Sequence, residues 1–358
     1  MTGPEITVVI PTFDRPDRLR RALEGTLRHH DGVAIEVVVV DDGSTDEGAV
    51  ATAVATATRG NTVPVSLVRQ ANQGPAAARN AGAAAAAGAV VLFLDDDCVP
   101  DPGCIGTHRA VQACATASSE GLAVLGRARW DPDLPVSPLM HVAMRGAQFD
   151  YDGIADPNDV PFSRFYTACA SVPRERFLGM GGFDTTLPRY AAGEDTEFAW
   201  RWVQGGGRIA YRANATVRHD HHLELRPFLE RQRRAGRAAV EVVARHPELF
   251  EALGLDAIAD VSAREQFYVA LMRYAFVIGV EEGQHVPVEF ERGDAHVGLD
   301  ERGGEGSDTR PDLEHSGPGF EVGEPHDASR RVGIGEEVLA EGAARRLAVL
   351  GEIGRAHG

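Results

Sequence analysis

Four apolar runs lie in the first part of the chain, and segments of helical character separate each run from the next. The runs cover residues 6–10, 35–40, 63–68 and 89–94, and most of their side chains are large or β-branched. Nearly continuous apolar runs of this kind are typical of strands that are covered on both faces of a sheet. Their alternation with helices predicts an α/β domain with a mostly parallel sheet flanked by helices.

Residue types that commonly begin or end helices lie at the ends of the predicted helices. Pro16 lies in the first turn of a helix that we expect to end near residue 28, with Asp14 as its N-cap. Pro75 opens an alanine-rich helix, which Gly88 ends. These signals place the helices between the predicted strands.

Two of the predicted strands end in acidic clusters. The second ends in Asp41 and Asp42, and the fourth ends in Asp95, Asp96 and Asp97. Adjacent carboxylates repel one another and are costly to bury, whereas hard cations such as Mg²⁺ and Mn²⁺ take oxygen ligands. Open α/β sheets bind ligands beyond the carboxyl ends of their strands. The pattern predicts a metal-assisted site at the tip of the fourth strand; a solvated acidic loop is the alternative.

Composition and net charge limit the kinds of molecule that the protein is expected to bind. The chain of 358 residues is 43% hydrophobic and 25% charged, which is typical of a globular protein. Its net charge of −17 argues against a nucleic-acid partner, which would need a basic face. An acidic protein that handles an anionic substrate needs a cation as a bridge, which agrees with the predicted metal site.

The cysteines show no metal-binding or redox spacing. No C-x-x-C pair occurs in the sequence, so we expect free thiols in a reducing cytoplasm. The four positions are Cys98, Cys104, Cys114 and Cys169.

The sequence predicts neither a secretory leader nor a membrane span. The first strand follows residues 1–5 directly, without a basic segment. The longest apolar stretch, about residues 81–94, is shorter than the roughly 20 residues that a transmembrane helix needs. We therefore expect a cytoplasmic protein without a transmembrane segment, with peripheral attachment to a membrane left open.

A second acidic pair opens a helix later in the chain. Glu194 and Asp195 precede an apolar stretch, and a helix dipole stabilises negative charge at such an N-terminus. Trp200 and Trp202 are two positions apart and cannot share a helix face. We expect one of these tryptophans in the core and the other beside an acceptor cleft.

The chain is expected to divide into four parts. Helical periodicity begins after the last predicted strand, and a later stretch dense in Gly, Pro and acidic residues predicts disorder. The predicted parts are a catalytic domain at 1–224, a helical extension at 225–283, an acidic linker at 284–335, and a short helix with a tail at 336–358.

Six motifs occur in an order that resembles the family 2 glycosyltransferases, which have the GT-A fold with a Rossmann-like sheet. The resemblance covers about residues 5–240, and the ordered set is far more specific than any one motif. The motifs lie at 8–12 (VVIPT), 40–46 (VDDGSTD), 72–74 with 78–82 (NQG and ARNAG), 93–97 (FLDDD), 181–184 (GGFD) and 193–195 (GED).

The resemblance implies the transfer of a sugar from a nucleoside-diphosphate sugar, with UDP favoured, to an acceptor hydroxyl, usually with inversion. It implies Mn²⁺ or Mg²⁺ as cofactor, and a saccharide, a lipid-linked molecule or a small molecule as acceptor. A carboxylate acts as general base, and the metal neutralises charge on the leaving diphosphate.

The resemblance also assigns roles to individual residues. Asp195 falls on the general base, and Asp97 and His219 fall on the metal ligands. Glu194 and Trp200 are expected on the acceptor side. The residues expected to bind the nucleotide-sugar are Pro11, Thr12, Asp41, Arg79, Asp95 and Asp96.

Several alternatives stay open at this point. His221 competes with His219 for the metal, because alternate residues of an extended segment point the same way. Asp42 and Asp46 are expected mainly to hold a turn and cap a helix. The arginines at 231–237 form either a solvated helix face or a contact to a phosphate.

The chain also departs from the family pattern. The Q-x-x-R-W motif of processive members is missing, which favours transfer of single sugars. The stretch 167–171 (TACAS) lacks the Asn that is common there. A catalytically silent nucleotide-binding relative and a sugar nucleotidyltransferase are the alternative functions.

Overall fold

The computed structural model describes residues 3–115, 121–144, 148–187 and 193–249. The chain divides into two units, Met1–Gln284 and His285–Gly358, and all described residues belong to the first. The predictions made for the chain beyond residue 249, including the linker and the C-terminal helix, lie outside the described residues.

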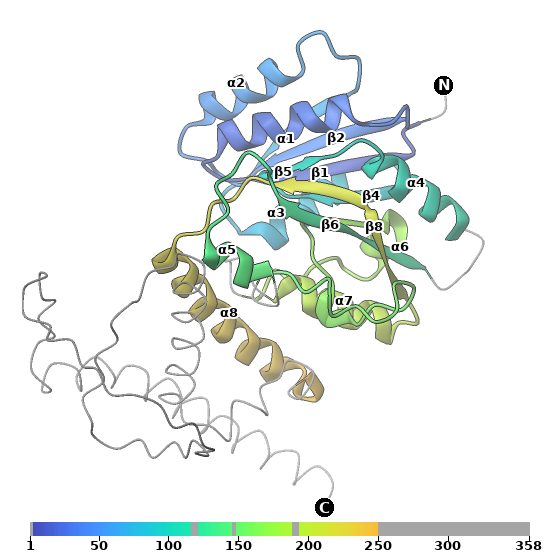
Figure 1. The fold of residues 1–358 in the computed structure, drawn as a ribbon. Helices are drawn as coiled ribbons and strands as arrows, with labels where there is room; N and C mark the ends of the chain where they lie inside the picture. Colours follow the sequence, from blue (N-terminus) through green and yellow to red (C-terminus); the bar gives the residue numbers. More distant parts are fainter. Residues whose placement is uncertain (1–2, 116–120, 145–147, 188–192, 250–358) are drawn as a thin grey trace, which may run out of the picture. The chain divides into compact units, whose positions relative to one another are not determined.

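An eight-stranded sheet forms the centre of the first unit (Figure 1), with strand order β3-β2-β1-β4-β7-β6-β8-β5. The strands β1 to β4 are parallel, β7 is antiparallel to β4 and β6, and β8 is parallel to β6 and antiparallel to β5. The strands are β1 (Ile6–Thr12), β2 (Ile35–Asp41), β3 (Val65–Arg69), β4 (Val90–Leu94), β5 (Cys98–Pro100), β6 (Leu122–Trp130), β7 (Cys169–Pro173) and β8 (Arg208–His219).

Helices flank the sheet, as predicted. Figure 1 shows α1 and α2 on one side of the strands and α3, α6 and α7 on the other. The helices are α1 (Pro16–Arg28), α2 (Glu47–Ala57), α3 (Pro75–Ala85), α4 (Cys104–Ala115), α5 (Pro138–Val142), α6 (Arg174–Gly179), α7 (Glu194–Gln204) and α8 (Leu225–Arg245), with 3₁₀ turns at Phe162–Arg164 and Pro247–Leu249.

The chain reverses its path across the sheet after β3. The crossovers from β1 to β2 and from β2 to β3 move toward one edge, and the crossover through α3 returns to β4 on the other side of β1. Because such crossovers are right-handed, the reversal puts α3 on the face opposite to α1 and α2. The tips of β1 and β4 therefore meet at a switch point, where α/β sheets bind ligands.

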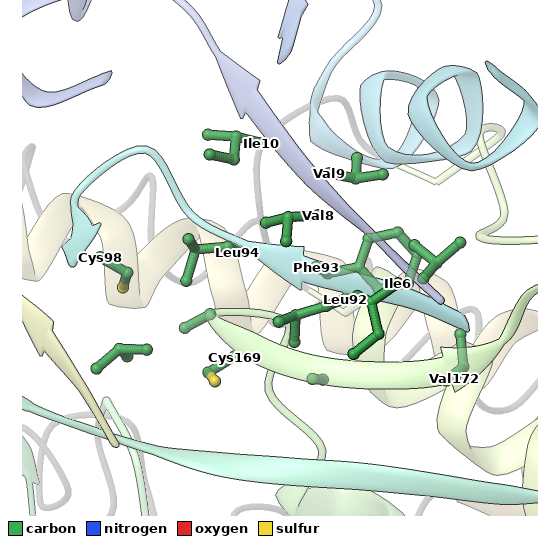
Figure 2. Close-up of a cluster of buried hydrophobic side chains, with 14 of the residues drawn as sticks. Ile6, Val8, Val9, Ile10, Leu92, Phe93, Leu94, Cys98, Cys169 and Val172 are labelled. Carbon is green, nitrogen blue, oxygen red and sulfur yellow. The ribbon is translucent and has the colours of Figure 1, made fainter. Parts of the chain in front are cut away.

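The core forms because apolar positions recur with the period of each element. In α1, Leu19, Leu23 and Leu27 are four residues apart and at most 4% exposed. Figure 2 shows the apolar side chains of β1, β4 and β7 packed together. Burying a side chain of this size contributes about 1.5–3 kcal/mol.

A glycine allows α3 to lie close to β1. A Cβ atom on Gly82 would lie 2.3 Å from Cγ1 of Val9. The absence of a side chain at Gly82 lets the helix pack against the strand, and Arg79 lies one turn earlier on the same helix. The approach of α3 thus determines where the Arg79 side chain reaches.

The predicted N-cap of the first helix is wrong. Arg15 is the N-cap residue of α1 and makes no side-chain capping bond. Asp14 has a positive φ of 54° and instead accepts hydrogen bonds from the backbone N and the hydroxyl of Thr45, at 2.7 and 2.9 Å. Asp14 therefore joins the β1–α1 loop to the loop after β2, because this longer-range pairing replaces the local cap.

Candidate active site

Thr12 and Asp96 join the tips of β1 and β4. The Thr12 hydroxyl donates to Oδ2 of Asp96 at 2.7 Å, and both residues are buried. Burial, followed by the negative charge of Asp97, raises the pKa of Asp96 to about 7. Pro11, also assigned to the nucleotide-sugar, lies half-buried beside Thr12 in β1.

Asp97, His219 and His221 form a cluster that can hold a cation. One ligand atom from each lies within 4.8 Å of the other two. Oδ1 of Asp97 is 3.3 Å from Nε2 of His219, and Oδ2 is 3.2 Å from Nδ1 of His221. The structure therefore brings both candidate histidines to the same carboxylate, one on each oxygen.

The rings around this cluster are fixed by stacking. His219 is the last residue of β8 and pairs in register with Trp130 of β6. The rings of Trp130 and His219 stack with centroids 5.3 Å apart, and those of His219 and His221 with centroids 5.4 Å apart. His219 is therefore held at the end of a strand, while Asp97 lies in the turn between β4 and β5 and His221 lies just after β8.

The donor set fits a divalent cation. A carboxylate with two imidazoles suits Mn²⁺, and Nδ1 of the buried His219 has no hydrogen-bond partner. Burial tends to raise the pKa of Asp97, but the adjacent His219 and His221 lower it well below its usual range. Asp97 is thus held as a carboxylate, the form that binds a cation.

Two arginines of α1 reach the same carboxylates. Nη1 of Arg15 is 3.2 Å from Asp96 and 3.4 Å from Asp97, and Nη1 of Arg18 is 3.6 Å from Asp97. Sequence reasoning missed both residues. The available signal was two basic residues at the start of the helix that follows Thr12: Arg15 is the N-cap of α1, and Arg18 lies in its first turn.

The acids at the end of β2 are bonded to nearby protein groups. Asp41 is 1% exposed and accepts from the backbone N of Ser44 at 2.9 Å and from Nη1 of Arg69 at 2.6 Å. Asp42 accepts from the backbone N of Gly74 at 2.8 Å. Asp46 caps α2 by accepting from the backbone N of Ala49 at 2.9 Å. The expected cap by Asp46 is confirmed, whereas Asp42 bonds the loop before α3 rather than its own turn.

Arg79 connects the β4 tip to the start of α7. Its guanidinium donates to Oδ1 of Asp95 at 2.7 Å and to Oε1 of Glu194 at 3.0 Å. Arg79 is buried, and burial lowers its pKa less than Asp95 and Glu194 raise it, so its pKa is raised overall. The two acidic motifs, about a hundred residues apart in sequence, therefore meet around one permanent positive charge.

Asp195 follows Glu194 in the first turn of α7, whose N-cap is Gly193 with a φ of 90°. Oδ1 of Asp195 accepts a hydrogen bond from the backbone N of Thr196 at 2.8 Å. Burial, followed by the negative charge of Glu194, raises the pKa of Asp195 to about 7. A carboxylate with this pKa can exchange a proton near neutral pH.

A cavity of about 290 Å³ lies beside Arg79, Asp95, Glu194 and Asp195. Helix α8 contributes a wall through Arg231, which donates to Oε1 of Gln148. The remaining lining residues are Gln148, Phe149, Tyr166, Thr167, Ala168, Gly193, Thr196, Gln232, Ala235, Ala239 and Val242.

Arg231 faces the acids across this space. Burial lowers the pKa of Arg231, and the charges of Asp195, Asp95 and Asp97 counteract that effect. A solvated helix face was one interpretation of this arginine run; for Arg231 it is wrong, because the side chain lines the cavity.

Trp200 does not line the cavity. Its ring lies 4.3 Å, centroid to centroid, from that of His246 and packs near Leu187 and Val242. Trp202 is fully buried in the core. Aromatic side chains of the cavity wall come instead from Phe149 and Tyr166, beside Gln148.

Within residues 3–115, 121–144, 148–187 and 193–249, no helix combines the length and apolarity that crossing a bilayer requires.

Several known proteins are similar to this chain in sequence. The pre-mycofactocin glycosyltransferase of Mycobacterium tuberculosis is 29% identical over 254 residues, which cover 69% of this chain and 50% of that protein. The chain thus spans about half the length of that relative. The succinoglycan biosynthesis protein ExoO of Rhizobium meliloti is 40% identical over 94 residues, 26% of each protein.

Among solved structures, the mannosyltransferase PcManGT from Pyrobaculum calidifontis in complex with GDP-Man and Mn²⁺ is 18% identical, with a TM-score of 0.45 over 78% of this chain and 87% of that one. Staphylococcus aureus TarS 1–349 is 16% identical, with a TM-score of 0.46 over 76% and 81%.

The family match covers the strands and loops that carry the site. Residues 7–110 match glycosyl transferase family 2, and this range includes Thr12, Asp41, Arg79 and the acids of the β4 tip. The motifs at 181–184 and 193–195 follow in the order expected of that family. Residues 7–110 are thus similar to glycosyl transferase family 2, and the relative that matches 69% of this chain carries the name glycosyltransferase.

Proposed function

We propose that this protein transfers a single sugar from a nucleoside-diphosphate sugar to an acceptor hydroxyl by metal-assisted single displacement with inversion. The observation that carries the proposal is the Arg79 bridge. It joins Asp95, next to the cation cluster, to Glu194, next to the candidate base, at one cavity. Donor and acceptor groups would thus meet between the β4 tip and α7.

Asp195 is the proposed general base. It lines the cavity, and its pKa of about 7 lets it take a proton from an acceptor hydroxyl near neutral pH. Its neighbour Glu194 is paired with Arg79 and is therefore less suited to accept that proton. Arg79 acts in this proposal as a positioning residue that fixes the acid pair relative to Asp95.

The cluster of Asp97, His219 and His221 is the proposed cation site. When bound there, Mn²⁺ or Mg²⁺ would neutralise charge that develops on the diphosphate leaving group. Arg15 and Arg18 add positive charge beside Asp97, and Arg231 adds it from the cavity wall. These arginines reduce the repulsion between an anionic donor and the acids of the site.

The nucleotide end of the donor is assigned to the tips of β1 and β2. Pro11, Thr12 and Asp41 lie at adjacent strand ends, because β1 and β2 are parallel and in register from Ile6 to Thr12. The carboxyl edge of these strands is where an α/β sheet receives a nucleotide.

A panel of nucleotide-sugars tests the proposed reaction. Full-length protein is incubated with UDP-, GDP- and dTDP-sugars and Mn²⁺, and the products are separated chromatographically. Release of a nucleoside diphosphate is expected. In a parallel incubation with added pyrophosphate, formation of a nucleoside triphosphate and a sugar 1-phosphate would instead indicate a nucleotidyltransferase. Binding without turnover of any donor would indicate a silent relative.

The Glu194→Gln variant tests the pH dependence. The base must be ionised, so activity should fall below pH about 7, the pKa of Asp195. Glu194 raises that pKa, so removing its charge should move the acidic limb of kcat/KM to lower pH. A limb that stays in place would assign it to another group, such as Asp96. Glu175→Gln, which removes an exposed charge from α6, is the matched control.

Single histidine variants test the cation ligands. His219 is buried and fixed between Trp130 and His221, whereas His221 is half-buried and also contacts Arg18. We expect His219→Ala to weaken Mn²⁺ affinity more than His221→Ala, with partial activity regained at high Mn²⁺. Titration of Mn²⁺ by electron paramagnetic resonance measures this directly. A larger loss in His221→Ala would make His221 the principal ligand.

A further inference from the structure

A second set of metal-ligating side chains lies apart from the site described above. Cys104 and His108 are one turn apart on α4, and Cys169 opens β7. The three residues are at most 1% exposed. Figure 2 shows Cys169 among the apolar side chains of the core. Neither the family assignment nor the proposed reaction uses this cluster.

The distances in the cluster are those of ligands around one ion. The two sulfurs of Cys104 and Cys169 are 3.8 Å apart, and Nε2 of His108 is 3.3 Å from Sγ of Cys169. All three ligand atoms lie within 4.8 Å of one another. In a tetrahedral site with Zn–S bonds of about 2.3 Å, two sulfurs lie about 3.8 Å apart and a nitrogen lies about 3.6 Å from each.

A hydrogen bond at Nδ1, on the side of the ring away from Cys169, orients the imidazole of His108. Nδ1 of His108 is 2.9 Å from Oγ of Ser171, which accepts from Nε2 of Gln112 at 3.1 Å. Both partners are buried. A ligating histidine is typically held in this way, with one ring nitrogen bonded to an outer group and the other directed at the metal.

The backbone of Gly126 comes close to two of the three ligands. A Cβ on Gly126 would lie 2.5 Å from Sγ of Cys169, 3.2 Å from Nε2 of His108 and 2.6 Å from the carbonyl oxygen of Ala215. The β6–β8 pairing shifts register here, between Leu125 and Arg127. The glycine thus keeps a side chain away from the sulfur of Cys169 and from Nε2 of His108.

We propose that Cys104, His108 and Cys169 bind a structural Zn²⁺ ion that ties α4 to β7. Two thiolates balance the charge of Zn²⁺, and a neutral complex can be buried where an isolated charge cannot. Thiolates are soft ligands, so this site favours Zn²⁺, whereas the carboxylate of Asp97 suits Mn²⁺.

Binding is a ligand exchange without redox chemistry. Two S–H bonds break, two Zn–S bonds form, and two protons leave. Without an ion, the contact with Cys169 and burial raise the pKa of the Cys104 thiol well above its usual range, so this thiol stays protonated. The site could not be recognised from the sequence. Cys104 and His108 have a C-x₃-H spacing on one helix, and the third ligand, Cys169, is distant along the chain.

Zinc content tests the proposal independently of the proposed reaction. Full-length protein carrying Asp97→Ala, so that the other cluster is disabled, is purified, treated with EDTA and analysed by mass spectrometry for metals. We expect stoichiometric zinc. Adding Cys104→Ser or His108→Gln should reduce zinc to trace amounts, whereas Cys114→Ser, at an exposed cysteine of the same helix, should retain it.

A second measurement does not depend on the variants folding. Wild-type protein is unfolded, stripped of metal and refolded with Co²⁺. Thiolate-to-cobalt charge-transfer absorption in the near ultraviolet is expected. Wild-type protein that is purified without zinc and shows no such band would overturn the proposal, as would a Cys104–Cys169 disulfide found by alkylation and mass spectrometry.

Discussion

Replacing Asp97 by alanine is expected to abolish the Mn²⁺-dependent binding of a nucleoside diphosphate. Asp97 contributes one oxygen toward each of His219 and His221, so its loss removes the centre of the cluster. The loss of affinity should exceed the roughly 10–100-fold cost of removing an outer partner of a metal ligand. Calorimetric titration of UDP with and without Mn²⁺ measures this effect.

The Asp97→Ala protein should still fold. Its partners Arg15 and Arg18 keep 45% and 34% of their side-chain surface exposed, so water can solvate both guanidinium groups after the substitution. The control is Glu175→Ala, which removes the same charge from an exposed site on α6. An Asp97→Ala protein that bound UDP–Mn²⁺ as tightly as wild type would move the cation site elsewhere.

Asp195→Asn is expected to slow transfer by roughly 10²–10⁴-fold, the usual contribution of a general base. The amide keeps the shape of the side chain and cannot take a proton from the acceptor. Donor binding should change little, because no described contact joins Asp195 to the cation cluster or to the tips of β1 and β2. Single-turnover kinetics with saturating donor separates the chemical step from binding.

The matched comparison for Asp195→Asn is Glu194→Gln. The latter removes a charge from the adjacent position but leaves the proposed base in place, so it should alter the pH profile more than the maximal rate. A wild-type rate in Asp195→Asn would show that another group accepts the proton.

The strands and the acidic tips were predictable because their signals are local. The apolar runs of β1, β2 and β4 are continuous, and each acidic cluster comes directly after its strand. The strand β8, Arg208–His219, has no such local signal over its full length. Exposed polar residues interrupt the apolar pattern of β8. Its pairing with β5 and β6 joins distant parts of the chain, so the local sequence does not reveal it.

The connections across the site were not predictable, because they join distant positions. Arg79 was expected at the nucleotide, but its guanidinium is paired with Asp95 and Glu194. Trp200 was expected at the acceptor, but it packs against His246, a residue of the segment after α8. The sequence supplies the residue types, while the packing of α3, α7 and α8 decides which of them meet.

The configuration at the transferred sugar carbon tests the central claim most directly. That claim is a single displacement in which Asp195 takes the acceptor's proton on the face opposite the leaving diphosphate. Proton NMR of the first glycosylated product, formed with Mn²⁺ and the donor found in the panel, reads the anomeric configuration. We expect inversion relative to the donor. A product that retains the donor's configuration would contradict it.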